Sequence, residues 1–147
     1  MAQVRRAVAS WEGDLLAGSG HVSAESTGIF RDLPVTWKAR TEDAEGMTSP
    51  EELLAAAHAS CFSMAGSNNL AKAGTPAERL DVSVEVTADK RDAGWTVLSS
   101  AITVRGRVPG IDQEAFRAAA EGAKDGCPIS RALAGNVELS VEATLER

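Results

Sequence analysis

The sequence predicts an α+β fold, and two of its segments carry the prediction. Within residues 80–107, apolar and polar residues alternate over long stretches, which is the pattern of strands with one buried face. Residues 50–73 instead form a long alanine-rich run with helix start and stop signals at its ends. No linker-like segment divides the 147 residues, so we expect one domain over residues 1–147.

The N-terminal part is expected to be a small antiparallel arrangement of short strands. Residues 3–11 and 20–25 have strand-like composition and are separated by a glycine-containing turn. A third short strand is expected around Val35, Trp37 and Ala39, where large or apolar residues alternate with polar ones. The chain thus begins with β-structure.

The long helix is predicted over residues 50–73. Ser49 suits the N-cap, Pro50 the first helical position, and acidic residues follow in the first turn. Gly74 suits the C-terminal end. Apolar and small residues leave almost no polar face along the first four turns, so we expect this helix to be buried on nearly all sides.

The C-terminal half is expected to add a hairpin, two helices and a last strand. Residues 80–107 predict a long hairpin with its turn at residues 92–94. A helix is predicted over residues 112–124, beginning at an aspartate cap, and a short one over residues 128–133. Alternating apolar residues predict the final strand over residues 137–143.

Composition and charge exclude several classes of protein. The net charge is −6, and no basic cluster interleaved with aromatic residues is present, so we expect no nucleic-acid partner. No apolar stretch is long enough to predict a membrane span. The first residues lack the apolar run of a signal peptide, so we expect a cytoplasmic location, in which thiols are kept reduced.

The two cysteines occupy different sequence environments, which points to redox chemistry. Cys61 lies within the apolar helix pattern, where a buried thiol has a raised pKa. Cys127 lies between Gly126 and Pro128, at a predicted helix N-cap that favours the thiolate. From the residues alone, Cys127 is therefore the more easily ionised thiol. A transient disulfide between Cys61 and Cys127 fits a reducing compartment better than a permanent one.

The same residues are compatible with two other kinds of site and with an inert core cysteine. A metal site could combine His21, His58, Cys61 and Cys127, but the sequence has no C-x-x-C or H-x-x-x-H pair, so no metal is expected. A hydrolase could use His58 as the base for Cys61. That alternative leaves Cys127 without a role. Cys61 as an inert core cysteine is the ordinary fate of a buried thiol.

Three segments resemble the OsmC/Ohr family (osmotically inducible protein C and organic hydroperoxide resistance proteins). They are Trp11-Glu12-Gly13, the stretch SPEELLAAAHASCFSM at residues 49–64, and GCPIS at residues 126–130. The resemblance covers essentially the whole chain. It is closer to the OsmC branch, because of the sequence HASCFSMA, the turn at residues 92–94 and the sequence VPGID at residues 108–112.

The resemblance implies an intertwined homodimer with antiparallel sheets wrapped around long central helices. It also implies a thiol-dependent peroxidase that reduces organic, and less efficiently inorganic, hydroperoxides in defence against oxidative and osmotic stress. No cofactor is implied, and a dithiol reductant, such as a dihydrolipoyl protein, would regenerate the enzyme. The alternative from another class is a redox-sensing or stress-binding protein without turnover.

Residue roles follow from the same resemblance. Cys61 matches the peroxide-attacking cysteine, Cys127 the resolving cysteine, Arg40 the activating arginine and Glu51 the carboxylate partner of that arginine. A guanidinium suits this role because it stays charged in a desolvated pocket, where it stabilises a thiolate. The apolar walls expected around the substrate are Leu54, Phe62 and Met64.

Spacing along the helix constrains these roles. Glu51 precedes Cys61 by ten residues, which corresponds to roughly 15 Å of rise in an unbroken helix. One arginine cannot easily bridge that span. We therefore expect either that the helix bends or that Arg40 and Glu51 reach Cys61 from the other subunit.

Overall fold

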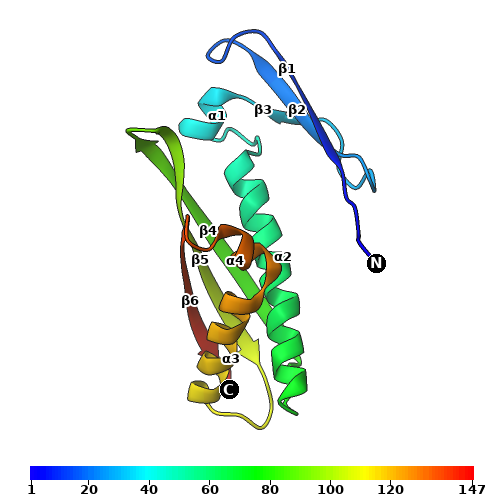
Figure 1. The fold of residues 1–147 in the computed structure, drawn as a ribbon, viewed down its shortest axis with the longest axis vertical. Coiled ribbons are helices and arrows are strands. Elements are labelled where there is room, and N and C mark those ends of the chain that lie inside the picture. Colours follow the sequence, from blue (N-terminus) through cyan, green and yellow to red (C-terminus); the bar gives the residue numbers. More distant parts are fainter. The chain divides into compact units, whose positions relative to one another are not determined.

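The computed structural model describes residues 1–147. The chain divides into two compact units, Met1–Leu53 and Leu54–Arg147. Each unit is described here by itself, and the ribbon in Figure 1 is coloured along the chain. No helix is long and apolar enough to cross a lipid bilayer.

The first unit contains the predicted short antiparallel strands. Strands β1 (Ala7–Glu12), β2 (Ser19–Ala24) and β3 (Leu33–Val35) form a three-stranded sheet in that order. Helix α1 (Trp37–Thr41) follows directly. The expected strands near residues 3–11 and 20–25 are confirmed, with the first one beginning later than expected.

The expected third strand through Ala39 is wrong beyond Val35. At that point α1 begins, because the Thr36 hydroxyl accepts a hydrogen bond of 3.1 Å from the Ala39 N–H. A threonine cap of this kind satisfies a backbone donor that the first helical turn leaves free. The alternation of large residues was therefore a weaker signal than the cap.

The long helix α2 (Pro50–Lys72) agrees with the prediction at both ends. The Glu52 N–H donates to the Ser49 hydroxyl over 3.1 Å at the start. After the last turn, Gly74 adopts a positive φ of 83°, a conformation that glycine takes without steric cost. The helix start and stop signals were sufficient here.

The buried face of α2 is narrower than the sequence predicted. Its buried residues are His58, Phe62, Gly66 and Leu70, spaced four apart along one stripe. On the opposite side, Met64 is 71% exposed. In the single chain, the expectation that α2 is buried on nearly all sides is therefore wrong.

The second unit is built on a sheet of β4 (Arg79–Arg91), β5 (Gly94–Arg107) and β6 (Glu138–Leu145). Strands β4 and β5 form the predicted antiparallel hairpin, whereas β6 pairs with β5 in parallel. The connection to β6 runs through α3 (Gln113–Gly126) and α4 (Pro128–Leu133). This crossover makes the parallel pairing possible. The α+β class is confirmed, and the sheet is mixed.

The core of the second unit lies between one face of this sheet and helices α2 and α3 (Figure 1). Phe62 and Leu70 of α2 meet Ile102 and Val104 of β5 and Phe116 of α3 in one apolar cluster. The inward residues of β4 alternate with exposed ones along the strand. This cluster holds α2 and α3 against the sheet.

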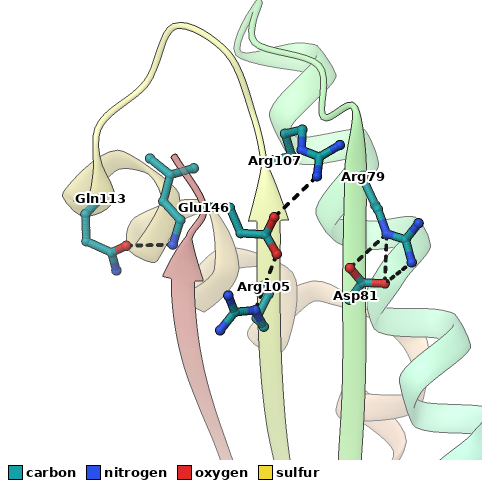
Figure 2. Close-up of polar contacts among 7 residues, drawn as sticks. Arg79, Asp81, Arg105, Arg107, Gln113 and Glu146 are labelled. Atoms are coloured by element: carbon teal, nitrogen blue, oxygen red, sulfur yellow. Dashed lines mark hydrogen bonds and ion pairs between the residues drawn. The ribbon is translucent and has the colours of Figure 1, made fainter.

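Polar contacts tie the last strand to the rest of the unit (Figure 2). The Gln113 amide donates to the Ala143 carbonyl and accepts from the Leu145 N–H, both over 2.8 Å. Glu146 pairs with Arg105 and Arg107 across the strands. These ion pairs are largely exposed and contribute little stability, whereas the two Gln113 hydrogen bonds reach the backbone of β6 directly.

Candidate functional site

Both cysteines are free thiols in the second unit, and Cys61 is less buried than the sequence predicted. Cys61 on α2 is half-buried, whereas Cys127, between α3 and α4, is fully buried. Cys61 faces a cavity of about 450 Å³ bounded by α2 and by the end of α3 and the start of α4. Cys127 does not line this cavity, although its neighbours Gly126 and Pro128 do.

Cys127 caps α4, as the sequence predicted. The Ser130 N–H donates to the Cys127 Sγ over 3.3 Å, and the thiol donates to the Ser130 Oγ over 3.3 Å. Burial by itself would raise the pKa of Cys127, but the hydrogen bonds from Ser130, from Cys61 and from the Ile129 backbone outweigh it and lower the pKa. The thiolate of Cys127 is thus favoured.

The pKa of Cys61 moves in the opposite direction. Burial raises the pKa of Cys61, and the neighbouring Cys127 raises it further through a hydrogen bond and charge. The Ile129 backbone N–H and the charge of Arg131 lower it in part. Arg131 was missed in the sequence analysis, because a lone arginine on a short helix gives no signal of its own.

His58 lies in a closed polar network beneath these cysteines. It is completely buried, and its Nδ1 lies 2.6 Å from the Ser100 Oγ and its Nε2 2.7 Å from the Ser130 Oγ. Burial lowers the pKa of His58. The hydrolase alternative, with His58 as the base for Cys61 and an acid behind it, does not match this arrangement.

The residues of the alternative metal site do not come together in the structure. The structure contains no group of three or more histidine, cysteine, aspartate or glutamate side chains placed to hold a metal ion. His21 lies on β2 of the first unit, with its Nδ1 3.4 Å from the Ser10 Oγ. Both ring nitrogens of His58 are occupied by serine hydroxyls.

The three residues expected to form apolar substrate walls lie in different surroundings. Met64 lines the cavity beside Cys61. Phe62 is 1% exposed and packs in the core cluster with Phe116. Leu54 is half-buried in the first turns of α2. The structure therefore brings only Met64 of this set to the Cys61 cavity.

Arg40 and Glu51 meet in the first unit, as the predicted pair requires. Arg40 Nη2 lies 2.8 Å from Glu51 Oε2, and Arg40 Nε donates to both carboxylate oxygens, at 3.0 Å to Oε1 and 3.2 Å to Oε2. The side chains are 29% and 12% exposed, so the pair is partly desolvated. The guanidinium also lies 5.6 Å from the centre of the Trp37 ring, a cation–π distance.

An apolar cavity adjoins this ion pair. It measures about 220 Å³ and is lined mainly by Trp11, Leu15, Val35, Trp37 and Arg40. A bidentate carboxylate and an aromatic face hold the guanidinium in one orientation beside apolar walls. Such a setting strengthens the electrostatic effect of Arg40 on any anion that enters.

Comparisons with known proteins identify the family and the fold. The family described as OsmC-like protein matches residues 22–142 of the chain. Among solved structures, the fold is similar to that of the organic hydroperoxide resistance protein OhrB of Bacillus subtilis, with a TM-score of 0.75 at 22% identity over 95% of this chain and 98% of that one. An organic hydroperoxide resistance protein of Elizabethkingia anophelis has the same TM-score of 0.75 at 22% identity, covering 99% and 100% of the two chains.

Sequence comparisons separate two branches of relatives. Peroxiredoxin OsmC of Escherichia coli (strain K12) is 41% identical over 94% of this chain and 95% of its own length. Organic hydroperoxide resistance protein OhrA of Bacillus subtilis (strain 168) is 28% identical over 84% of this chain and 86% of its own length. The chain therefore belongs to the OsmC-like protein family, and within it lies closer to the OsmC branch than to the Ohr branch.

Proposed function

We propose that this protein is a cysteine-based peroxidase that reduces organic hydroperoxides through Cys61 and Cys127. The observation that carries the proposal is the pair of free, interacting thiols with opposite pKa shifts beside an open cavity. The names of the relatives, a peroxiredoxin and organic hydroperoxide resistance proteins, support the same class of substrate.

In the proposed reaction, the Cys61 thiolate attacks one peroxide oxygen. The O–O bond breaks, an alcohol leaves after protonation, and Cys61 becomes a sulfenic acid. Cys127 then attacks the Cys61 sulfur, expels the sulfenic oxygen as water and closes a disulfide. A dithiol, such as a dihydrolipoyl protein, reduces this disulfide by attack on one of its sulfurs. The low pKa of Cys127 makes it a good leaving group in that step.

Arg40 is proposed to activate Cys61 from a composite site in a homodimer. The pKa of Cys61 is raised in the single chain, so a further cation is needed to favour its thiolate at neutral pH. Arg40, held by Glu51 beside an apolar cavity, has the charge and the orientation for this. Exposed apolar side chains of the first unit, such as Leu16 and Ile29, support association of two copies.

Peroxide consumption over many enzyme equivalents tests the proposed function. Purified protein with excess dithiol should turn over cumene hydroperoxide continuously, and faster than hydrogen peroxide. The Cys61→Ser variant should consume none. The Cys127→Ser variant should consume one equivalent and then stall or over-oxidise, because no resolving thiol protects the sulfenic acid.

Each contrary result has a distinct meaning. Consumption of one equivalent or none by the wild-type protein would favour a redox sensor over a peroxidase. If Cys127→Ser were inactive and Cys61→Ser consumed one equivalent, the two cysteines would exchange roles. The double variant Cys61→Ser/Cys127→Ser is the control for background reaction of the peroxide with dithiol.

A further inference from the structure

A continuous chain of hydrogen bonds leads from Cys127 into the core of the second unit. The Cys127 Sγ lies 3.3 Å from the Ser130 Oγ, which lies 2.7 Å from the His58 Nε2. The His58 Nδ1 in turn lies 2.6 Å from the Ser100 Oγ. Four elements or their junctions thus meet in one network: α2, β5, the α3–α4 junction and α4.

This network is sealed from solvent. His58, Ser100 and Cys127 are each 0% exposed, and Ser130 is 1% exposed. A buried imidazole with both nitrogens bonded to neutral hydroxyls has a fixed orientation and no counter-ion. A polar group in such a place costs free energy unless it is fully hydrogen-bonded, and a core leucine could fill the space without that requirement.

The hydrogen-bond directions follow from the donors available. When Cys127 is a thiol, it donates to the Ser130 oxygen, so the Ser130 hydroxyl proton points to the His58 Nε2. When Cys127 is a thiolate, it accepts from the Ser130 hydroxyl, whose oxygen can then accept from a protonated His58 Nε2. The contacts therefore give the Cys127 proton a direct route to His58.

We propose that Ser130 and His58 form a buried proton relay for Cys127, in which Ser130 contacts the sulfur and His58 is a positioning residue that takes up the proton through it. The inference rests on the proposed function, because it assigns how Cys127 is activated in the resolving step. Neither His58 nor Ser130 has a part in the attack of Cys61 on peroxide.

The resolving step balances as follows. The Cys127 proton passes to the Ser130 oxygen while the Ser130 proton passes to the His58 Nε2. The Cys127 sulfur attacks the Cys61 sulfur, the S–S bond forms, and the S–O bond of the sulfenic acid breaks. Cys127 is oxidised and the sulfenic sulfur is reduced, so no other oxidant is needed. The departing hydroxide and the proton that His58 later releases make one water.

The surrounding charges leave His58 free to act as a neutral acceptor. The pKa of His58 is lowered by burial, and no charged group contributes to that shift. Strand β5 has no titratable side chain between residues 94 and 104. The charge of Arg131 on α4 acts on Cys61, and Lys124 of α3 is paired with Glu121 and Asp125. Neutral imidazole therefore persists below pH 6.5, its ordinary pKa.

Two oxidants separate the relay from the peroxidase proposal. Cumene hydroperoxide starts from the Cys61 sulfenic acid, whereas diamide, an azo oxidant, activates a thiol and lets the second thiol close the disulfide without peroxide. Reduced protein is mixed with either oxidant, quenched over time with acid and an alkylating agent, and its thiols are counted by mass spectrometry. Both reactions need deprotonation of Cys127.

The variants Ser130→Ala and His58→Gln should close the disulfide on the order of 100-fold more slowly at pH 7 with either oxidant. Ser130→Thr keeps the hydroxyl and should restore most of the rate. Formation of the sulfenic acid should stay within a few-fold of wild type in all of them. Ser140→Ala, an exposed serine on β6, is the matched control.

The pH profile gives a readout that a merely structural role would not move. In wild type, the closing rate should fall little between pH 7.5 and 6, whereas in His58→Gln it should fall more steeply, because it then follows the thiolate fraction of Cys127. Wild-type rates and profiles in both Ser130→Ala and His58→Gln would overturn the relay. Failure of wild type to form sulfenic acid with peroxide would overturn the peroxidase proposal, and the diamide rates would still decide the relay. If His58→Gln failed to fold, the Ser130→Ala and Ser130→Thr pair would decide it.

Discussion

At the scale of the residue, the Arg40–Glu51 pair gives a test of how orientation matters. Two parallel hydrogen bonds hold the guanidinium, and lysine, as a compact point charge, cannot reproduce them. Arg40→Lys is therefore expected to slow the reaction of Cys61 with cumene hydroperoxide by at least about tenfold, although the charge is kept. Stopped-flow measurement of the first turnover checks this.

The chain provides a matched control for that substitution. Arg79 makes the same forked contact with Asp81, but on the exposed face of β4, where the two side chains are 65% and 49% exposed. Arg79→Lys should leave the first-turnover rate unchanged. An Arg40→Lys rate equal to that of wild type would remove the pair from the reaction.

His58 also gives a prediction for stability against pH. Its pKa is lowered below 6.5 in the folded chain, so between that lowered value and 6.5 the unfolded chain binds a proton that the folded chain does not. The free energy of unfolding therefore rises with pH in this window. The contribution of His58 to it is lost as pH falls through the same window, by at most about 1.4 kcal/mol per pH unit for one proton.

Urea unfolding of wild type and His58→Gln from pH 7.5 to 5 measures this contribution. The variant should show a flatter dependence of unfolding free energy on pH, whatever its absolute stability. His21→Gln removes an exposed histidine and controls for the loss of an imidazole as such. Identical slopes for wild type and His58→Gln would contradict the lowered pKa.

The residues of the site differ in how far sequence could predict them. The role of Cys127 as a cap follows from its neighbours along the chain, and it was predicted. The partners of His58 lie 42 and 72 residues away, and hydroxyls at such separations leave no local pattern. The incomplete burial of Cys61 and the complete burial of Cys127 have the same origin, because burial depends on which elements pack over each thiol.

At the scale of the element, local signals decided what was predictable. The ends of α2 and of the β4–β5 hairpin follow from caps, turns and alternation within a few residues. The third strand was misjudged because Thr36 could serve either a strand or a helix cap. The parallel pairing of β6 could not be predicted from its own alternation, which is the same for either direction.

Strand β6 depends on Gln113 for two backbone contacts, which gives a prediction at this scale. Gln113→Ala removes the side-chain partner of the Ala143 carbonyl and of the Leu145 N–H. Because both contacts are exposed, it is expected to lower the free energy of unfolding by about 0.5–1.5 kcal/mol. Chemical denaturation measures it. Gln3→Ala, in the exposed N-terminal segment, is the matched control and should change nothing; equal effects of the two substitutions would refute the assigned tie.

At the scale of the whole molecule, the first unit has too little core for its size. Of residues 1–53, only Gly20 and Ala39 are buried, while Leu16 and Ile29 are 79% and 82% exposed. Exposed apolar groups of this size mark association surfaces. The homodimer proposed for this chain would cover these side chains. The order of the elements along the chain does not reveal that they are left exposed.

We therefore predict a dimer of about twice the chain mass of 15.3 kDa in solution. Light scattering after gel filtration at micromolar concentration measures it. The double variant Leu16→Asp/Ile29→Asp should shift the protein toward the monomer, because burial of a carboxylate in an apolar interface is costly. Ser140→Asp on exposed β6 is the control for added charge, and a monomeric wild type would contradict the prediction.

The buried stripe of α2, formed by His58, Phe62, Gly66 and Leu70, limits which of the two cysteines can move when the disulfide closes. Cys61 and Phe62 are consecutive and lie about 100° apart around the helix axis. Any rotation of α2 about its axis that moves the Cys61 sulfur toward Cys127 therefore turns Phe62 by the same angle within the apolar cluster that surrounds it. A cluster packed at the density of a protein interior resists such a rotation. The approach to the S–S distance of about 2.05 Å therefore falls to Cys127, which has an extended backbone at the α3–α4 junction and lies in neither helix, while α2 keeps its position.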